Sequence, residues 1–398
     1  MKGKMPGVTL VADWAPKPGF RLGAKDVEGR QTYLGSQVWR NPRLEIRDYD
    51  IPTPGPEEVL LEVKACGICG SDVHMAQADN EGYIYYPGLT GFPSILGHEF
   101  SGVVVEAGRK AFDKRTNRAF KGGERVTSEE MLWCGQCRPC ADGQPNHCEQ
   151  LDEVGFNVNG AYARYMVLPA RTIWSLEPLA RVYKGDDIFL AGSLVEPASV
   201  AYNAVIVRGG GIRPGDRVVI LGGGPIGLAA CAILKRAGAS QVIISEPQEE
   251  RTRIALQIGA DHVINPLQED FADRVLELTE GMGADLFMEA TGLPTAVYPG
   301  IERVIWEGRT LNSRVIVTAR AEAKMPVTGE VLQVRRASII GAQGHSGHGN
   351  FPRVIECMAS GMDMTGLSTK KISLEELPEN IIRLQTDRSE CKITYVAP

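Results

Sequence analysis

Four cysteines lie close together in the run CGQCRPCADGQPNHC, at Cys134, Cys137, Cys140 and Cys148. Thiolates at this C-x2-C-x2-C-x7-C spacing can surround one Zn²⁺ as a tetrahedron. Such a shell is complete and leaves no position for a substrate. The run therefore predicts a structural zinc site, and any reaction must take place at another site.

Other interpretations of the cysteine run are weaker. Disulfides need an oxidising compartment, and the N-terminus has no apolar stretch of signal-peptide length. An iron–sulfur run has another spacing and a proline after its last cysteine, whereas Glu149 follows Cys148. Redox-active or inert thiols remain as minor alternatives. A zinc module for nucleic acid would need a basic surface.

A second group of potential ligands lies on both sides of the cysteine run. Cys69 belongs to CGICGSDVH, His98 and Glu99 belong to GHEF, and Glu196 precedes a proline. These segments place a thiolate, an imidazole and two carboxylates in loops flanked by glycine and proline. Three protein ligands with a free fourth position are the architecture of a catalytic zinc. We therefore expect two zinc ions per chain, one closed and one open.

The second half of the chain contains a nucleotide-binding pattern. A β-branched strand, 216–221, leads into GGGPIG and then into an Ala- and Leu-rich helix over 228–236. The first glycine of such a turn permits the tight bend, the second lets the backbone approach a pyrophosphate, and the third lets helix and strand pack closely. The phosphates then lie at the helix N-terminus, where free N–H groups point outward. We expect the cofactor to contact Gly222, Gly224, Pro225, Ile226 and Gly227.

An acid follows this turn at the expected distance. The next strand, 241–245, ends at Glu246, about 20 residues past the glycines, where a carboxylate holds the adenosine ribose hydroxyls. Its charge would repel a 2′-phosphate, which favours NAD over NADP. Arg251, one helical turn further on, either stacks on the adenine or is a solvated surface charge. A glycine-rich turn in another kind of α/β protein is the alternative for the whole unit.

Strands and helices alternate beyond the glycine turn. We predict strands over 262–264, 285–288, 314–318 and 338–340, with helices over 249–258 and 271–279. This alternation implies a doubly wound parallel sheet with right-handed crossovers, a Rossmann fold. Thr291 and Gly292 follow the fourth strand at its carboxyl end, where ligands approach such sheets. We expect these two residues near the nicotinamide.

Taken together, the motifs resemble those of the zinc-dependent medium-chain alcohol and polyol dehydrogenases, over roughly 43–395. CGICGSDVH resembles the first zinc motif of the family, which implies that Cys69 rather than Cys66 is the ligand. GHEFSG resembles the second, which implies His98 as a ligand and Glu99 as a ligand or a neighbouring carboxylate. The four-cysteine run matches the family's structural-zinc lobe.

Roles can be expected for three further residues. A Glu-Pro pair at Glu196 resembles the polyol and threonine dehydrogenase branch, where Glu replaces the Cys of simple alcohol dehydrogenases. Glu196 then either binds the metal or holds the metal-bound water. Asp72 is expected to hydrogen-bond the zinc-bound His98 and fix its tautomer. Lys392 is expected to approach the NAD pyrophosphate.

The implied reaction is reversible oxidation of a secondary alcohol, with zinc as Lewis acid and hydride transfer to NAD. In the family a hydroxyl passes the proton through the nicotinamide ribose to a histidine near the surface. Ser71 and His74 stand at the matching positions, and a pKa near neutrality suits histidine to this task. The alternatives are a loop-capping hydroxyl for Ser71 and a structural hydrogen bond for His74.

The resemblance implies an α/β protein with two domains, a GroES-like, β-rich catalytic domain and a Rossmann cofactor domain. A chain of 398 residues is indeed too long for one typical core. We expect the catalytic domain, with both zinc sites, over 1–197 and 342–398, and the cofactor domain over 198–341. The active site then lies in the cleft between them. The family usually forms dimers or tetramers, so a homo-oligomer is expected.

Composition limits the partners and the compartment. The 43 Lys and Arg against 49 Asp and Glu leave a formal net charge of −6, which argues against nucleic acid and anionic membranes. No uninterrupted apolar stretch reaches the length of a membrane span. Nine cysteines without a signal peptide fit a reducing cytoplasm.

Three segments, 16–41, 76–91 and 110–120, depart from a typical family member. The second is rich in Tyr and polar residues and starts near Cys69, so we expect it to shape the substrate pocket or an oligomer contact. The segment 343–348, QGHSGH, either contacts substrate or nicotinamide or forms a glycine-rich hinge.

The candidate pocket residues are polar, which favours a small polyhydroxylated substrate. Taken whole, the chain most resembles the branch of the family that oxidises a cyclitol ketone at a neighbouring carbinol. A sorbitol- or threonine-type dehydrogenase is the alternative. A non-catalytic, zinc-lobed binding protein is a remote one.

Overall fold

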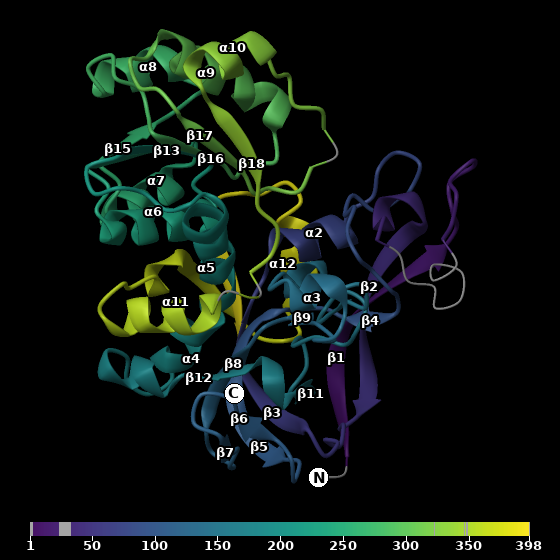
Figure 1. The fold of residues 1–398 in the computed structure, drawn as a ribbon. Helices are drawn as coiled ribbons and strands as arrows, with labels where there is room; N and C mark the ends of the chain where they lie inside the picture. The colour runs from purple at the N-terminus through teal and green to yellow at the C-terminus, as the bar shows by residue number, and fades with distance from the viewer. Residues whose placement is uncertain (1–2, 24–32, 322, 346, 348, 398) are drawn as a thin grey trace.

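The structure is a computed structural model that describes residues 3–23, 33–321, 323–345, 347 and 349–397. Two parts can be distinguished, each built around its own large β-sheet (Figure 1). Part of the predicted insertion 16–41 and two residues of the segment 343–348 lie outside the described residues.

The first large sheet has six parallel strands in the order β15-β14-β13-β16-β17-β18. Its order reverses between β14 and β16, on either side of the central strand β13, and ligands bind such sheets at this switch point. All six predicted strands are confirmed to within a residue or two. They are β13 (Arg217–Leu221), β14 (Gln241–Ser245), β15 (His262–Ile264), β16 (Leu286–Glu289), β17 (Arg314–Val317) and β18 (Ser338–Gly341).

Helices cover both faces of this sheet, which explains why its strands are apolar throughout rather than alternating. Residues of α8, α9 and α10 form a buried cluster on one face, and residues of α6 and α7 lie in the cluster on the other (Figure 1). The predicted helices at α6, α7 and α8 are confirmed. The bounds are α6 (Pro225–Ala237), α7 (Glu249–Gln257), α8 (Phe271–Leu278), α9 (Pro294–Glu307) and α10 (Gly329–Arg335).

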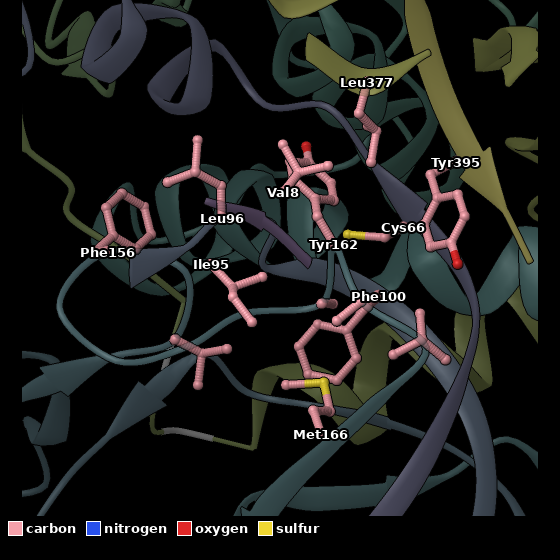
Figure 2. Close-up of a cluster of buried hydrophobic side chains, with 14 of the residues drawn as sticks. Val8, Cys66, Ile95, Leu96, Phe100, Phe156, Tyr162, Met166, Leu377 and Tyr395 are labelled. Carbon is pink, nitrogen blue, oxygen red and sulfur yellow. The ribbon is translucent and has the colours of Figure 1, made fainter. Parts of the chain in front are cut away.

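The second large sheet has seven strands, in the order β12-β8-β5-β3-β20-β19 with β11 also paired to β3. Its apolar core includes Ile95, Leu96, Phe100 and Tyr162, which gather in Figure 2. The bounds are β3 (Glu58–Gly67), β5 (Glu99–Ala107), β8 (Arg125–Ser128), β11 (Tyr165–Pro169), β12 (Ile173–Ser175), β19 (Ser368–Ile372) and β20 (Lys392–Val396).

Strand register in this sheet brings distant residues together. β3 lies between β5 and β20, with Gly67 opposite both Glu99 and Thr394. One edge of the sheet therefore contains the end of β3 together with the starts of β5 and β20. This edge, next to α2 (Gly70–Ala76), positions the predicted open metal site.

Helices also join the two parts. α4 (Asp187–Ser193), α5 (Val195–Tyr202) and the helical turn Asn203–Arg208 form one run, and α11 (Asn350–Ala359) packs against α5. Residues of α5 and α11 belong to the same apolar cluster as β13, β14 and α6. The proposed cofactor domain, 198–341, therefore shares its core with α11.

By length and composition the helical run Asp187–Arg208 could cross a membrane. However, 78% of its most apolar window is buried inside the protein, as in a core helix, so the run is weak evidence for a span. The sequence prediction missed it because Glu196 interrupts the apolar stretch.

The four-cysteine run forms a small lobe on a two-stranded ribbon. β9 (Met131–Leu132) enters the lobe and β10 (Asp152–Glu153) leaves it, and the two strands pair antiparallel. The insertion 110–120 forms a hairpin of β6 (Phe112–Asp113) and β7 (Arg118–Ala119). The remaining elements are β1 (Lys4–Trp14), β2 (Trp39–Asp50), β4 (Ser94–Ile95), α3 (Arg138–Ala141), α12 (Leu377–Arg383) and the short helices Gly35–Gln37, Pro145–His147, Ala170–Thr172, Glu177–Arg181 and Thr365–Leu367.

Candidate active site

A cleft with a volume of about 1580 Å³ lies between the two sheets. Residues from both parts line it. From the catalytic side come Cys69, Ser71, His74, His98 and Glu196, and from the cofactor side Gly222, Gly224, Pro225, Ile226, Gly227, Glu246, Arg251, Thr291 and Gly292. The structure thus brings most of the predicted site residues to one cavity.

The predicted open metal site is assembled at the sheet edge described above. One potential ligand atom each from Cys69, His98 and Glu99 lies within 4.8 Å of the others. Cys69 is the N-cap residue of α2, and Glu99 opens β5 directly after His98. Sulfur, nitrogen and oxygen donors in this arrangement are the donor set that zinc takes in catalytic sites.

Asp72 orients the first two ligands. Its Oδ1 lies 3.7 Å from His98 Nδ1, and its Oδ2 accepts hydrogen bonds from the Cys69 N–H and the Tyr162 hydroxyl, both at 2.9 Å. Burial lowers the pKa of His98, but Asp72 and the other carboxylates outweigh this and leave the pKa raised. Since Nδ1 faces Asp72, Nε2 is the nitrogen that faces the cleft, 3.4 Å from Ser71 Oγ.

Glu99 is paired with a buried lysine. Lys392 Nζ lies 2.7 Å and 2.5 Å from the two Glu99 oxygens and also donates to the Ile68 carbonyl. Burial would lower the pKa of Lys392, but Glu99 raises it to about 12, so the pair is ionic. β20 places the Lys392 ammonium on Glu99, and its expected approach to the pyrophosphate stays a prediction. A Cβ at Gly67 would lie 2.3 Å from Glu99 Oε2, so this pairing requires glycine there.

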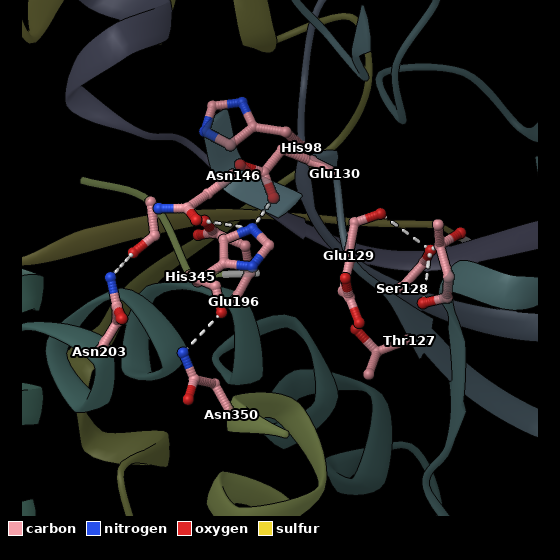
Figure 3. A network of polar contacts seen from close by, with 12 residues as sticks. His98, Thr127, Ser128, Glu129, Glu130, Asn146, Glu196, Asn203, His345 and Asn350 are labelled. Carbon is pink, nitrogen blue, oxygen red and sulfur yellow. Dashed lines mark hydrogen bonds and ion pairs between the residues drawn. The ribbon is translucent and has the colours of Figure 1, made fainter. Parts of the chain in front are cut away.

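Glu196 belongs to a second buried group, with Glu130 and His345 (Figure 3). His345 Nε2 contacts the Glu130 carboxylate and lies 3.5 Å from Glu196 Oε1. Burial, helped by His98, lowers the pKa of His345 to about 3, so the imidazole is neutral. Burial and then Glu99 raise the pKa of Glu196. Sequence reasoning missed Glu130. The only signal was the pair Glu129-Glu130 directly before Met131-Leu132 at the start of the cysteine lobe.

The residues of the open site fit a zinc ion. Burial and then Glu99 raise the pKa of the Cys69 thiol to about 12, so the thiolate needs a cation beside it. Cys69 and His98 supply two ligands. Either Glu99, already neutralised by Lys392, or Glu196 on α5 can supply the third.

The four cysteines also fit zinc, as a closed site. Their sulfur atoms lie within 4.8 Å of one another. Backbone N–H groups of Gln136 and Cys137 point at Cys134 Sγ at 3.4 Å and lower its pKa to about 6, which favours the thiolate that binds metal. With four sulfur donors the shell has no open position.

The glycine turn has the form expected for a pyrophosphate site. Gly222 has φ +101°, and a Cβ at Gly227 would lie 2.0 Å from the Gly222 carbonyl oxygen. A Cβ at Gly224, the N-cap residue of α6, would meet nothing within 4 Å. The space over this helix N-terminus is therefore open to a phosphate.

Glu246 and Arg251 lie beside this turn. Glu246 is buried and accepts hydrogen bonds from the Gly223 and Gln248 N–H groups, both at 2.8 Å. Arg251 Nη1 lies 4.0 Å from Glu246, and its Nη2 donates to the Glu390 carbonyl. Arg251 is therefore tied to the protein at the cleft wall rather than freely solvated.

Thr291 and Gly292 form a turn held by one carboxylate. Both N–H groups and the Thr291 hydroxyl donate to Glu289 Oε1, and Glu289 is buried at the end of β16. The sequence had not indicated this role for Glu289. Its carboxylate fixes the backbone at the carboxyl edge of the sheet, where we expect the nicotinamide.

Comparisons with known proteins agree with this site. The family model "Alcohol dehydrogenase GroES-like domain" matches residues 55–178, and the model "Zinc-binding dehydrogenase" matches residues 225–360. The chain is 65% identical over 395 residues to scyllo-inosose 3-dehydrogenase of Thermotoga maritima, which covers 98% of this chain and 100% of that protein.

More distant relatives and a solved structure extend the comparison. L-threonine 3-dehydrogenase of Pyrococcus horikoshii is 35% identical over 266 residues, covering 67% of this chain and 70% of that protein. A Thermotoga maritima protein solved as an alcohol dehydrogenase has a TM-score of 0.95 and 64% identity, over 99% of this chain and 100% of that one.

The class that fold and site define is therefore a zinc-binding oxidoreductase with a GroES-like domain and a Rossmann domain. Within that class, the chain belongs to the zinc-binding alcohol dehydrogenase family. The predicted resemblance, fold class and kind of enzyme are confirmed.

Proposed function

We propose that this enzyme oxidises a secondary alcohol of a polyol or cyclitol with NAD, and that its substrate is scyllo-inosose, oxidised at the 3-position. The observation that carries the proposal is the 65% identity over 98% of the chain to the Thermotoga maritima scyllo-inosose 3-dehydrogenase. Identity at this level spans the insertion 76–91 as well as the motifs. The threonine dehydrogenases match between 65% and 71% of the chain, so threonine is the alternative.

Two zinc ions per chain are part of the proposal. Cys69, His98 and either Glu99 or Glu196 would hold the catalytic ion, which supplies a Lewis acid for the substrate oxygen when bound. Cys134, Cys137, Cys140 and Cys148 would hold the structural ion. Asp72 keeps the His98 ring in the tautomer that leaves Nε2 free to bind metal.

Ser71 and His74 would move the proton released by the alcohol. They lie one turn apart on α2, both in the cleft wall, and Ser71 Oγ faces the ligand nitrogen of His98. Burial and then Arg388 lower the pKa of His74, so its imidazole stays neutral and able to accept a proton at neutral pH.

Glu246 supports NAD rather than NADP. Its buried carboxyl group already accepts two backbone N–H groups and lies where the adenosine ribose would bind. A 2′-phosphate would be placed against this acidic group, and Arg251 beside it is engaged by Glu246 and Glu390. We also propose a homo-oligomer and a cytoplasmic location, the latter because all nine cysteines are free thiols.

The test is turnover by the purified, zinc-loaded protein. We expect NADH formation with scyllo-inosose, slower reaction with sorbitol and threonine, and much weaker activity with NADP than with NAD. Zinc analysis should give two ions per chain. Turnover of threonine with no turnover of any cyclitol or polyol would replace this proposal by the threonine alternative, and no turnover of any of them would overturn it.

A further inference from the structure

Two glutamates outside the predicted site lie on the ribbon that carries the cysteine lobe. Glu130 stands directly before β9, and Glu153 is the second residue of β10. β9 and β10 pair with Glu153 opposite Met131, and the Val154 N–H donates to the Glu130 carbonyl at 2.9 Å. The two glutamates are therefore neighbours across the ribbon, although 23 positions separate them.

Both side chains face the cleft that contains the open metal site. Glu130 and Glu153 are 5% and 4% exposed, and both line the cavity together with Ser71, His98 and Glu196. Glu130 contacts His345, and no hydrogen bond satisfies its Oε2 within the described residues. Glu153 Oε2 is buried and has no hydrogen-bond partner within the described part of the chain. Such groups are costly to bury unless a ligand satisfies them.

The neighbouring Glu129 shows what a structural glutamate looks like in this lobe. Its carboxylate accepts hydrogen bonds from the indole N–H groups of Trp133 and Trp174 at 3.2 Å and 2.8 Å, and Lys114 lies 3.5 Å away. Glu129 is not among the residues that line the cleft. By contrast, Glu130 Oε2 and Glu153 Oε2 have no hydrogen-bond partner within the described residues, and both residues line the cleft.

A polyhydroxylated ring offers the matching chemistry. Each ring hydroxyl can donate and accept a hydrogen bond, and a carboxyl group accepts one as the carboxylate and donates one as the acid. A site built to bind a hydroxyl rejects an analogue that lacks it, because its polar group is then left unpaired. Phe156, 4.6 Å from His98 between ring centroids, also lines the cleft and offers an apolar surface to the ring carbons.

Resting on the proposed function, we propose that Glu130 and Glu153 recognise ring hydroxyls of the substrate other than the one that is oxidised, and that the four-cysteine lobe sets the spacing of these two carboxyl groups. The lobe closes the chain between β9 and β10, with Cys134 two residues after β9 and Cys148 four residues before β10. Asn146 within the lobe donates to the Gln343 carbonyl at 2.9 Å, which ties it to the loop that carries His345. The lobe thus positions substrate-binding groups.

The test compares a cyclitol with cyclohexanol, a ring alcohol without neighbouring hydroxyls, in Glu130→Gln and Glu153→Gln variants loaded with zinc and NAD. We expect each variant to lower the ratio of kcat/KM for scyllo-inosose to kcat/KM for cyclohexanol by at least about tenfold, mainly through KM. The affinity of the NADH complex for scyllo-inosose, which NADH cannot oxidise, is measured by calorimetry and should weaken in proportion. Glu129→Gln is the matched control and should keep the wild-type ratio.

Because Glu130 contacts the group that contains Glu196, the zinc content of each variant is measured first. If Glu130→Gln loses zinc or does not fold, Glu153→Gln decides, since no hydrogen bond or ion pair joins Glu153 to the potential zinc ligands in the described residues. If the folded, zinc-loaded variants keep the wild-type ratio of the two kcat/KM values, the inference is overturned while the proposed function stands. Absence of cyclitol and polyol turnover by the wild-type enzyme would instead overturn the proposed function.

Discussion

The two candidate metal sites of this protein differ in how they are built. The four-cysteine lobe takes all its donors from 15 consecutive residues, 134–148, and three of its four cysteines are partly exposed. The open site takes its donors from the start of α2, the start of β5 and α5, and a lysine from β20 pairs with one of them. The lobe can bind metal through local sequence, whereas the open site exists only when the seven-stranded sheet is formed.

This difference assigns different roles to the same metal. A closed shell holds chain segments at fixed spacing, and an open shell with buried, charged neighbours can act on a substrate. The comparison predicts that the two sites can be lost separately, with different consequences for activity, stability and substrate affinity.

Removing a ligand of the open site should have the largest effect. In Cys69→Ser we expect one zinc per chain instead of two and a loss of at least about a thousandfold in kcat/KM, because a Lewis acid contributes several kcal/mol to the barrier. Metal analysis and NADH formation measure both. A Cys69→Ser protein that keeps two zinc ions and wild-type activity would contradict the assignment.

Removing the buried ammonium of Lys392 should have the second-largest effect, which is a loss of stability. Lys392→Met leaves the Glu99 carboxylate 1% exposed without its partner, which we expect to lower the free energy of unfolding by about 3–5 kcal/mol. Denaturant unfolding measures it, and adding Glu99→Gln should restore part of the loss. Lys235→Met, which breaks the more exposed pair with Asp261, is the control and should cost less than about 1 kcal/mol. Equal costs would contradict the buried pairing.

Opening the lobe should have a smaller and more selective effect. Cys137→Ser removes one of four sulfurs, so we expect loss of the structural zinc alone and a rise of about tenfold in KM for the cyclitol, about 1.4 kcal/mol of binding. The reason is that β9 and β10 then hold Glu130 and Glu153 less firmly. Cys357→Ser, outside both metal groups, is the control. A folded Cys137→Ser that loses only the hydride step, judged by a deuterium isotope effect, would contradict this.

The smallest effect concerns the proton path. Burial and then Arg388 hold the pKa of His74 below 6.5, so the wild-type ring loses its proton-accepting form only as the pH falls through that lowered value. His74→Ala should slow alcohol oxidation a few-fold at low pH, with a smaller deficit at high pH, where hydroxide accepts the proton. Arg388→Gln should move the acid limb of the profile toward 6.5. A pH–rate profile unchanged in His74→Ala would remove His74 from the path.

Sequence patterns predicted most of the cofactor domain. Strands 241–245 and 262–264 were found at the predicted residues, and helices 249–258 and 271–279 each end one residue earlier. Such accuracy is possible because each element there is a separate run with its own turn residues, and the glycine turn has one backbone solution. Asp72 lies beside His98 as expected, since its position on α2, three residues from Cys69, is local, but at 3.7 Å from Nδ1 it does not make the expected hydrogen bond.

The polar groups whose partners the prediction missed share one property, which is that these partners are distant in sequence. Lys392 meets Glu99 only because β3 lies between β5 and β20. Glu130 meets His345 across 215 positions, and Glu153 becomes a cleft residue only through the β9–β10 pairing. Nothing in the composition of these segments separates a cleft carboxylate from one on the surface.

The sequence by itself therefore determined the run of four cysteines, the glycine turn and the candidate metal ligands. These features depend on residue type and short spacing, which chain connectivity alone preserves. Only the tertiary structure decided which carboxylates are neutralised, which are left free to bind a substrate, and how the four-cysteine lobe relates to the cleft. The physical reason is that the charge state and partners of a buried group depend on its desolvation and on neighbours brought by other strands, and both come into being only when the sheets close.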